Sequence, residues 1–265
     1  MQSRIKKKLF RSHLFSHLDG IVLIPTIIAL EKKNIISQLK KNSINELAEQ
    51  FNANEAYLNV ALRLLASQGI LRQIIYDDHN ICYENTNSIN ITSILKTYAL
   101  AQNIYIHNMD YNSIITDKKN IITEKKLYNT INNYISKKNI SNQIQDKHVE
   151  GIMLAPLIVL FSRNGFFNGE AINMSLLNNK WHNLIIQLFK HCKLIDNDKK
   201  LTEYGLFIFK RASAYGVTVS YLPTYRNIEN LIYRDANVLQ LDSNLDEEIH
   251  VDRDMNVWGS GGAHQ

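Results

Sequence analysis

Three side chains in the C-terminal part of the sequence, Tyr221, Tyr225 and Arg226, have the types and spacing expected along a substrate channel. A tyrosine presents an apolar ring with a polar hydroxyl, and an arginine binds a carboxylate or a phosphate through paired hydrogen bonds. Ordinary packing at the end of a strand accounts for the same residues equally well. Both interpretations therefore stay open at this level.

A second group of side chains lies in the acidic segment and the tail that follow. His250, Asp252, Asp254 and His264 carry the imidazole and carboxylate groups that suit iron or manganese. Their spacing is not diagnostic of a metal site, and a solvated acidic loop is the favoured interpretation.

Two further arrangements favour packing over chemistry. His13 and His17 are four residues apart, as in a metal-binding pair on a helix, but no Glu-x-x-His context accompanies them. His191 and Cys192 are a base and a nucleophile side by side, but adjacent residues on a helix point in different directions. We expect packing or surface roles for all four.

The composition narrows the class of protein. The 265 residues are 45% hydrophobic and 21% charged, as in an ordinary globular protein. The net charge of +5 lies partly in the lysine run at 6–8, and a mild excess of this kind indicates a solvated surface more than a nucleic-acid-binding face. The two cysteines fit a reducing compartment, and no apolar run reaches the roughly 20 residues of a membrane span. We therefore expect a cytoplasmic protein without membrane contact.

The elements that would position these residues begin with a winged helix-turn-helix. Ser43 and Glu46 have the spacing of a capping box at the start of a helix. A second helix over 55–68 is closed by Gly69, and two short apolar runs over 70–83 form a β-hairpin.

A similar order of elements returns later in the chain. An apolar helix over 148–161 and a helix over 181–191 precede two short strands around the polar turn 196–199, and Thr202 caps a further helix. This repetition predicts a second winged-helix-like unit.

The predicted fold is therefore mainly α with short β-hairpins, built from two tandem winged-helix-like units. Two helices over 10–39, with Pro25 near the start of the second, precede the capping box, and a short β-rich run is expected at 217–221. We divide the chain into a first helical, winged-helix-like unit (1–111), a polar connector with a loosely packed helix (112–143), a second winged-helix-like unit (144–214) and a junction segment (215–265).

Three segments carry a resemblance to a known family. They are 67–71 (SQGIL), 216–226 (GVTVSYLPTYR) and 251–264 (VDRDMNVWGSGGAH). Together they resemble the N-terminal lid and winged-helix region of class I S-adenosylmethionine-dependent methyltransferases of the bacterial polyketide-synthase type. The catalytic core of that family contains a D-x-G-x-G-x-G turn between a strand and a helix, and no such turn occurs in this sequence.

The resemblance implies a substrate lid that is inactive without the missing methyltransferase core. It implies S-adenosylmethionine as cofactor only together with that core, and iron or manganese as in metal-dependent relatives. It also implies an acyl carrier protein with a phosphopantetheine-bound acyl chain as partner, and a homodimer. The glycine-rich end at 258–265 is then the hinge into the core. The residues expected near substrate or cofactor are Tyr221, Tyr225, Arg226, Trp258, Gly261, Gly262 and His264.

The alternative function is a winged-helix transcription regulator that binds DNA. Its recognition helix would have to present side chains that read base edges. The helix over 55–68 offers Asn59, Arg63 and Gln68, with a single arginine among many apolar residues. This favours the lid over the DNA reader.

Overall fold

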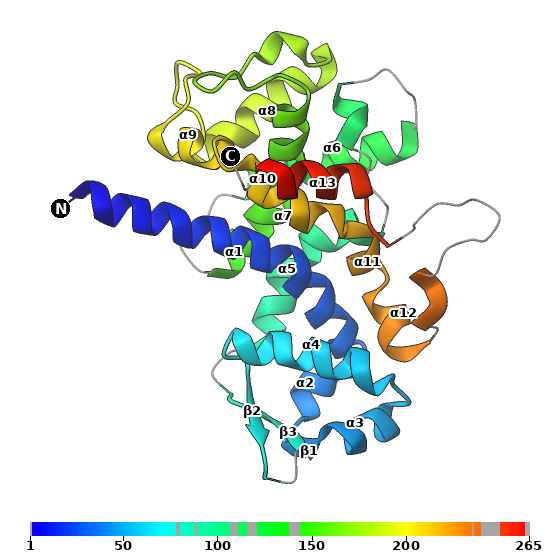
Figure 1. Cartoon of the computed structure of the whole chain (residues 1–265). Coiled ribbons are helices and arrows are strands. Elements are labelled where there is room, and N and C mark those ends of the chain that lie inside the picture. The colour runs from blue at the N-terminus through cyan, green and yellow to red at the C-terminus, as the bar shows by residue number, and fades with distance from the viewer. Residues whose placement is uncertain are drawn as a thin grey trace.

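The computed structural model describes residues 2–77, 80–87, 90–106, 111–115, 121–137, 144–234, 236–239 and 250–262. Figure 1 shows a mainly helical molecule with one small sheet at one end, which confirms the predicted fold class. The helices are α1 (Gln2–Glu31), α2 (Ile35–Gln38), α3 (Ile44–Phe51), α4 (Glu55–Ser67), α5 (Ile91–Ile106), α6 (Ile121–Ser136), α7 (Ile144–Arg163), α8 (Asn179–His191), α9 (Glu203–Phe209), α10 (Ala212–Ser220), α11 (Leu222–Arg226), α12 (Ile228–Tyr233) and α13 (Arg253–Gly262). The strands are β1 (Lys41–Ser43), β2 (Leu71–Ile75) and β3 (Ile81–Asn85), and 3₁₀ turns occur at Tyr111–Ile114, Met174–Leu176 and Ala236–Leu239.

The first winged helix forms as predicted. The Ser43 hydroxyl accepts from the Glu46 amide at 3.3 Å, and the Glu46 carboxylate accepts from the Ser43 amide at 2.9 Å. This capping box starts α3, and α4 follows after a short turn. Gly69 ends α4 with φ 71°, a conformation that glycine adopts without strain. The antiparallel strands then pair in the order β1-β3-β2.

The second unit is less regular than predicted. Asn178 caps α8 through its side chain, and the Thr202 hydroxyl accepts from the Gly205 amide to start α9. The two predicted strands reduce to a single antiparallel bridge between Ile195 and Leu201. The helices of this unit therefore carry nearly all of its packing.

Residues 217–221 and the predicted connector differ from the sequence predictions. Residues 217–221 fall in and just after α10, because burial of that helix overrides the strand preference of Val217 and Val219. The helix in the predicted connector is α6, and it is not loosely packed. Its residues Leu127 and Ile131 are fully buried against α5 and α8.

The centre of the molecule is the crossing of α1 and α7, where each helix presents a glycine. A Cβ at Gly20 would lie 2.4 Å from the His148 Cα, and a Cβ at Gly151 would lie 2.4 Å from the His17 Cα. The two backbones therefore touch. One continuous hydrophobic core surrounds this crossing and includes residues of both winged-helix-like units.

Pro25 lies inside α1, so its predicted place near the start of a second helix is wrong. A proline inside a helix has no N–H for the carbonyl four residues earlier, here that of Ile21. The Tyr105 hydroxyl, from α5, donates to that carbonyl at 2.5 Å. Pro156 in α7 frees the carbonyl of Ile152 in the same way. Tyr111 replaces that missing donor, with its hydroxyl 3.4 Å away.

Replacing Tyr105 by phenylalanine should lower the free energy of unfolding by about 1–2 kcal/mol, because the buried Ile21 carbonyl loses its donor. The same replacement should cost clearly less in a Pro25→Ala background, because an alanine amide at that position can donate to Ile21. Urea unfolding of the four proteins measures the coupling. Purely additive effects would show that the hydroxyl does not compensate for the proline.

The length and apolar character of helix α1 are relevant to the cellular location of the protein. The stretch Arg4–Glu31 is long and apolar enough to cross a membrane, but 67% of its most apolar window is buried inside the protein. A helix at the centre of a folded core has the same properties. The cytoplasmic location stays a prediction.

Candidate functional site

The structure brings two of the predicted site residues together at the junction of α11 with α1 and α5. Pro223 lies in the first turn of α11, where its missing N–H costs little. Tyr225 and Arg226 follow in the same short helix, and the ring of Tyr221 lies 6.5 Å from that of Tyr225. Tyr225 and Arg226 line cavities at this junction, whereas Tyr221 lines neither of them. Their role along a substrate channel stays a prediction.

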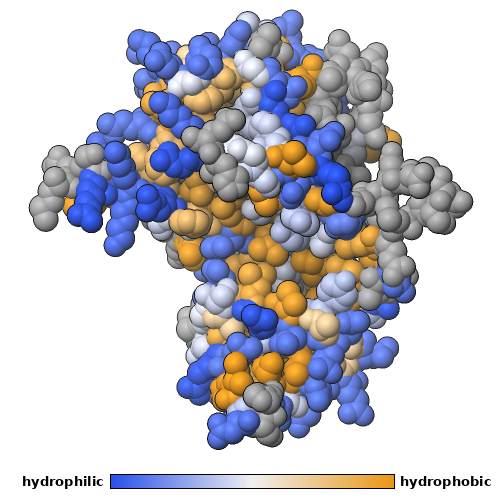
Figure 2. All heavy atoms as spheres, in the orientation of Figure 1, coloured by the Kyte–Doolittle hydropathy of each residue, from blue (hydrophilic) through white to orange (hydrophobic). Residues whose placement is uncertain are grey.

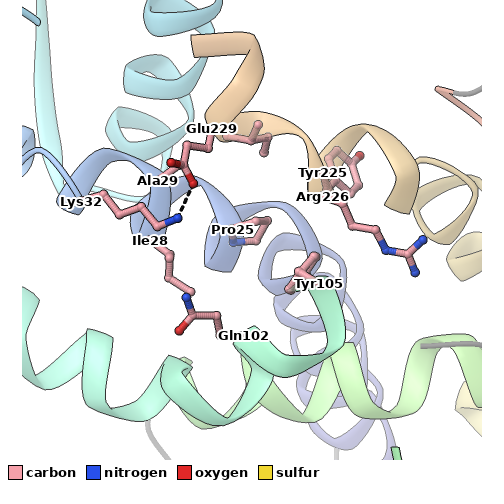
Figure 3. A pocket seen from close by; sticks show the side chains of 10 residues that line it. Pro25, Ile28, Ala29, Lys32, Gln102, Tyr105, Tyr225, Arg226 and Glu229 are labelled. Carbon is pink, nitrogen blue, oxygen red and sulfur yellow. Dashed lines mark hydrogen bonds and ion pairs between the residues drawn. The ribbon is translucent and has the colours of Figure 1, made fainter. Parts of the chain in front are cut away.

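The first cavity is a small pocket with a mixed polar and apolar lining (Figure 3). Its volume of about 80 Å³ is far below the several hundred Å³ typical of ligand sites. An ion pair between Lys32 and Glu229 closes one side, and Tyr105 and Tyr225 contribute to the wall. The pocket is the size for water molecules and cannot hold an organic substrate.

Arg226 is the most unusual group at this junction. Its Nε is buried and has no hydrogen-bond partner among the residues that the structure describes. Burial lowers the pKa of Arg226, an effect that Tyr111 and Tyr105 oppose. Figure 3 shows its side chain extending away from the Lys32–Glu229 pair. One donor of this buried guanidinium is therefore left unsatisfied by the described residues.

The second cavity is an apolar groove of about 250 Å³ between α1, α4, α11 and α12. It shares Tyr225 and Ile228 with the small pocket. Figure 2 shows hydrophobic residues gathered over this part of the visible face. Apart from Thr26 and Thr224, the lining is hydrophobic: Val22, Tyr57, Val60, Ala61, Leu64, Tyr225, Ile228, Leu231 and Ile232.

The helix α4 occupies the position of a recognition helix, but it is poorly equipped to read DNA. Asn59 accepts a hydrogen bond from the Tyr83 hydroxyl at 2.5 Å, and Gln68 interacts with the carboxylate of Asp19. Its outer face instead exposes Tyr57 at 39% and Val60 at 63%. Of the three predicted base readers, only Arg63 is left without such an interaction in the described part of the chain.

The glycine-rich end is helical as far as the structure describes it. The sequence predicted a hinge there, but α13 continues through Gly262 and packs against α10. A Cβ at Gly259 would lie 2.6 Å from the Val217 amide nitrogen, so the glycine permits a close helix crossing. Trp258 covers Gly216, while Gly261 faces open space. The predicted site residues Trp258, Gly261 and Gly262 therefore lie on a different element from Tyr225. His264 lies outside the described residues.

Two of the predicted metal ligands, Asp252 and His250, take part in hydrogen bonds within the chain. The Asp252 side chain accepts from the Met255 amide at 2.9 Å and so caps α13, and the His250 carbonyl accepts from the Thr224 hydroxyl. Within the described ranges, no three His, Cys, Asp or Glu side chains are grouped as a metal site would require. Iron or manganese therefore stays a prediction without structural support.

A buried polar network that the sequence did not predict lies at the crossing of α1 and α7. His17 and Glu150 are both fully buried, with the His17 Nε2 3.2 Å from a Glu150 oxygen. A carboxylate only accepts, so Nε2 carries the hydrogen, and Nδ1 lies 2.8 Å from the Tyr215 hydroxyl. Lys147 donates to both Glu150 oxygens. No local sequence signal joins residues so far apart in the chain.

Burial, hydrogen bonds and neighbouring charges all change the pKa of Glu150 in this network. Burial raises its pKa, but the hydrogen bonds and charges of His17 and Lys147 prevail and lower it to about 2. Burial similarly lowers the pKa of His148 to about 4 and raises that of the Cys192 thiol. The network therefore holds an ionised carboxylate without access to solvent, and it is structural.

The fold and the groove define a mainly helical winged-helix protein in which α4 exposes Tyr57 and Val60 beside an apolar groove. Two protein-family models match parts of the chain, the AprA N-terminal domain at residues 10–73 and the AprA winged helix domain at residues 150–235. The first match covers α1 through most of the first winged helix, and the second covers the second unit and α11–α12. Both are consistent with the winged-helix region of an AprA-type protein. No curated protein matches the chain.

Proposed function

We propose that the chain is the substrate-lid part of a polyketide-synthase-associated, S-adenosylmethionine-dependent methyltransferase that acts on an acyl chain bound to a carrier protein. The apolar groove between α1, α4 and α12 supports this proposal most directly. A regulator that reads DNA exposes basic and amide groups on its recognition helix, whereas α4 exposes Tyr57 and Val60. The apolar lining suits a short acyl chain, and the Arg226 Nε, which no described residue satisfies, belongs to the neighbouring pocket that shares Tyr225.

The role of the chain in that reaction is positioning. Its own residues would hold the acyl chain against Tyr225 and exclude water, which strengthens the electrostatic interactions at the reacting atoms. Among the described residues, the only clustered glycines lie in α13, where a helix packs on another helix. They do not form the strand–turn–helix that holds S-adenosylmethionine, so the cofactor belongs to the core.

Titration calorimetry with butyryl-pantetheine tests the groove. We expect weak binding that falls at least about tenfold in Val60→Glu, because a carboxylate in the apolar groove opposes the acyl chain. Val257→Glu is the matched control, since Val257 is 66% exposed on α13, away from the groove. Equal affinities of the two variants would refute the lid proposal, as would submicromolar binding of S-adenosylmethionine by the chain alone.

DNA binding remains the second candidate because of α8. This helix exposes Asn179, Asn183 and Gln187, which are side chains able to read base edges. A gel shift on the upstream DNA at increasing salt decides between the two functions. Loss of a specific, salt-dependent shift in Asn183→Ala/Gln187→Ala would establish the regulator instead of the lid.

A further inference from the structure

A basic groove of about 680 Å³ lies between the N-terminal part of α1 and the α9–α10 junction. Figure 1 shows this end of α1 projecting past α9. It is separate from the apolar groove and shares no residue with it. Its lining residues are Lys6, Lys7, Phe10, Glu203, Leu206, Phe207, Lys210 and Arg211.

The two walls of this groove carry positive charge. Lys6 and Lys7 lie on the α1 side, and Lys210 and Arg211 lie on the other. One carboxylate, that of Glu203, pairs with Lys6 at 3.2 Å. Lys7 and Lys210 form no ion pair with the described residues. Both side chains are exposed, so their charges face solvent.

The floor of the groove is apolar and aromatic. Phe10 and Phe207 pack with ring centres 5.6 Å apart, and Leu206 is half-buried beside them. The Arg211 guanidinium lies 3.8 Å from the centre of the Phe207 ring, which joins the apolar floor to a charged rim.

We propose that this groove binds an acidic amphipathic helix of a partner protein. An amphipathic helix that lies over the contact between α1 and α9 would place its apolar face on Phe10 and Phe207 and its carboxylates beside Lys7 and Lys210. Complementary charge of this kind guides association and register. A nucleic-acid backbone has no apolar face to place on Phe10 and Phe207.

The identity of the partner rests on the proposed function, under which the acidic helix belongs to the carrier protein. The groove would then hold the carrier while its acyl chain reaches Tyr225. The charge argument itself requires only an acidic helical surface, so the two claims are separable.

The proposal is tested by fluorescence anisotropy, which measures the affinity of the chain for two labelled probes. The probes are an acyl carrier protein and an acidic amphipathic helical peptide. Lys7→Glu/Lys210→Glu reverses one charge on each wall, and both side chains are exposed, so the fold should be unaffected. We expect affinity to fall at least about fivefold and its salt dependence to weaken. Lys96→Glu/Lys137→Glu is the control, with the same change in net charge on exposed residues of α5 and at the end of α6.

The outcomes separate the two claims. If both probes bind and only the groove variant loses affinity, the inference is supported. If the peptide shows that loss but the carrier protein does not bind, the groove stands and the carrier assignment under the proposed function fails. If probe binding is unchanged in the groove variant, or if only duplex DNA or anionic phosphatidylglycerol vesicles bind, the groove inference is overturned.

Discussion

Gly20→Ala should lower the free energy of unfolding by about 3 kcal/mol or more, the range in which a buried core is overpacked beyond relaxation. The added Cβ would lie 2.4 Å from the His148 Cα and 2.5 Å from its carbonyl oxygen. Both are backbone atoms, so no rotamer change relieves the contact. Since α1 and α7 are buried on both sides of the crossing, they cannot separate without opening the core.

Gly151→Ala should behave in the same way, because its Cβ would meet the His17 backbone. Gly261→Ala is the control. Gly261 lies in α13 and faces open space, so alanine there should be neutral or stabilise by up to about 1 kcal/mol through helix propensity. Thermal and urea unfolding of the three variants measure this contrast. Similar stabilities of Gly20→Ala and Gly261→Ala would mean that the helices do not touch as described.

His17→Phe should lower the free energy of unfolding by about 3–5 kcal/mol, because it removes a partner from a buried carboxylate. Glu150 would keep Lys147, but the Tyr215 hydroxyl would lose its bond to the imidazole. The double variant His17→Phe/Glu150→Leu removes both buried polar groups and should recover much of the loss. Urea unfolding measures the single variants and the double variant. If the double variant is as unstable as the sum of the single variants, the two residues do not act as a pair.

The same pair should make the protein sensitive to acid. The pKa of Glu150 falls from its ordinary 4.5 to about 2 on folding, so the unfolded chain binds more protons between these values. This stability is complete above about pH 4.5 and is lost as the pH falls towards 2, for a total of about 3 kcal/mol. The double variant should lack this part of the pH dependence. An identical pH profile of its melting temperature would contradict the assignment.

Local signals explain which elements were predictable. The Ser43 capping box and Gly69 act within a few residues, so the first winged helix could be predicted from its sequence. Local sequence also predicted Pro25 at a helix start, and this is wrong. The Tyr105 hydroxyl, which replaces the donor that the proline lacks, lies eighty residues away in the chain. The run at 217–221 has strand propensity, but burial against α7 and α13 makes it helical.

The candidate site likewise has some features that the sequence predicts and others that only the tertiary structure shows. By itself, the sequence determined the helical class and the winged-helix order, because capping residues and short-range periodicity act over a few neighbouring residues. Only the tertiary structure decided that α4 turns Val60 towards a groove with α12, and that His17 meets Glu150. Such contacts form when buried helices cross at glycines, and the cost of burying a charge selects partners that no spacing in the chain reveals.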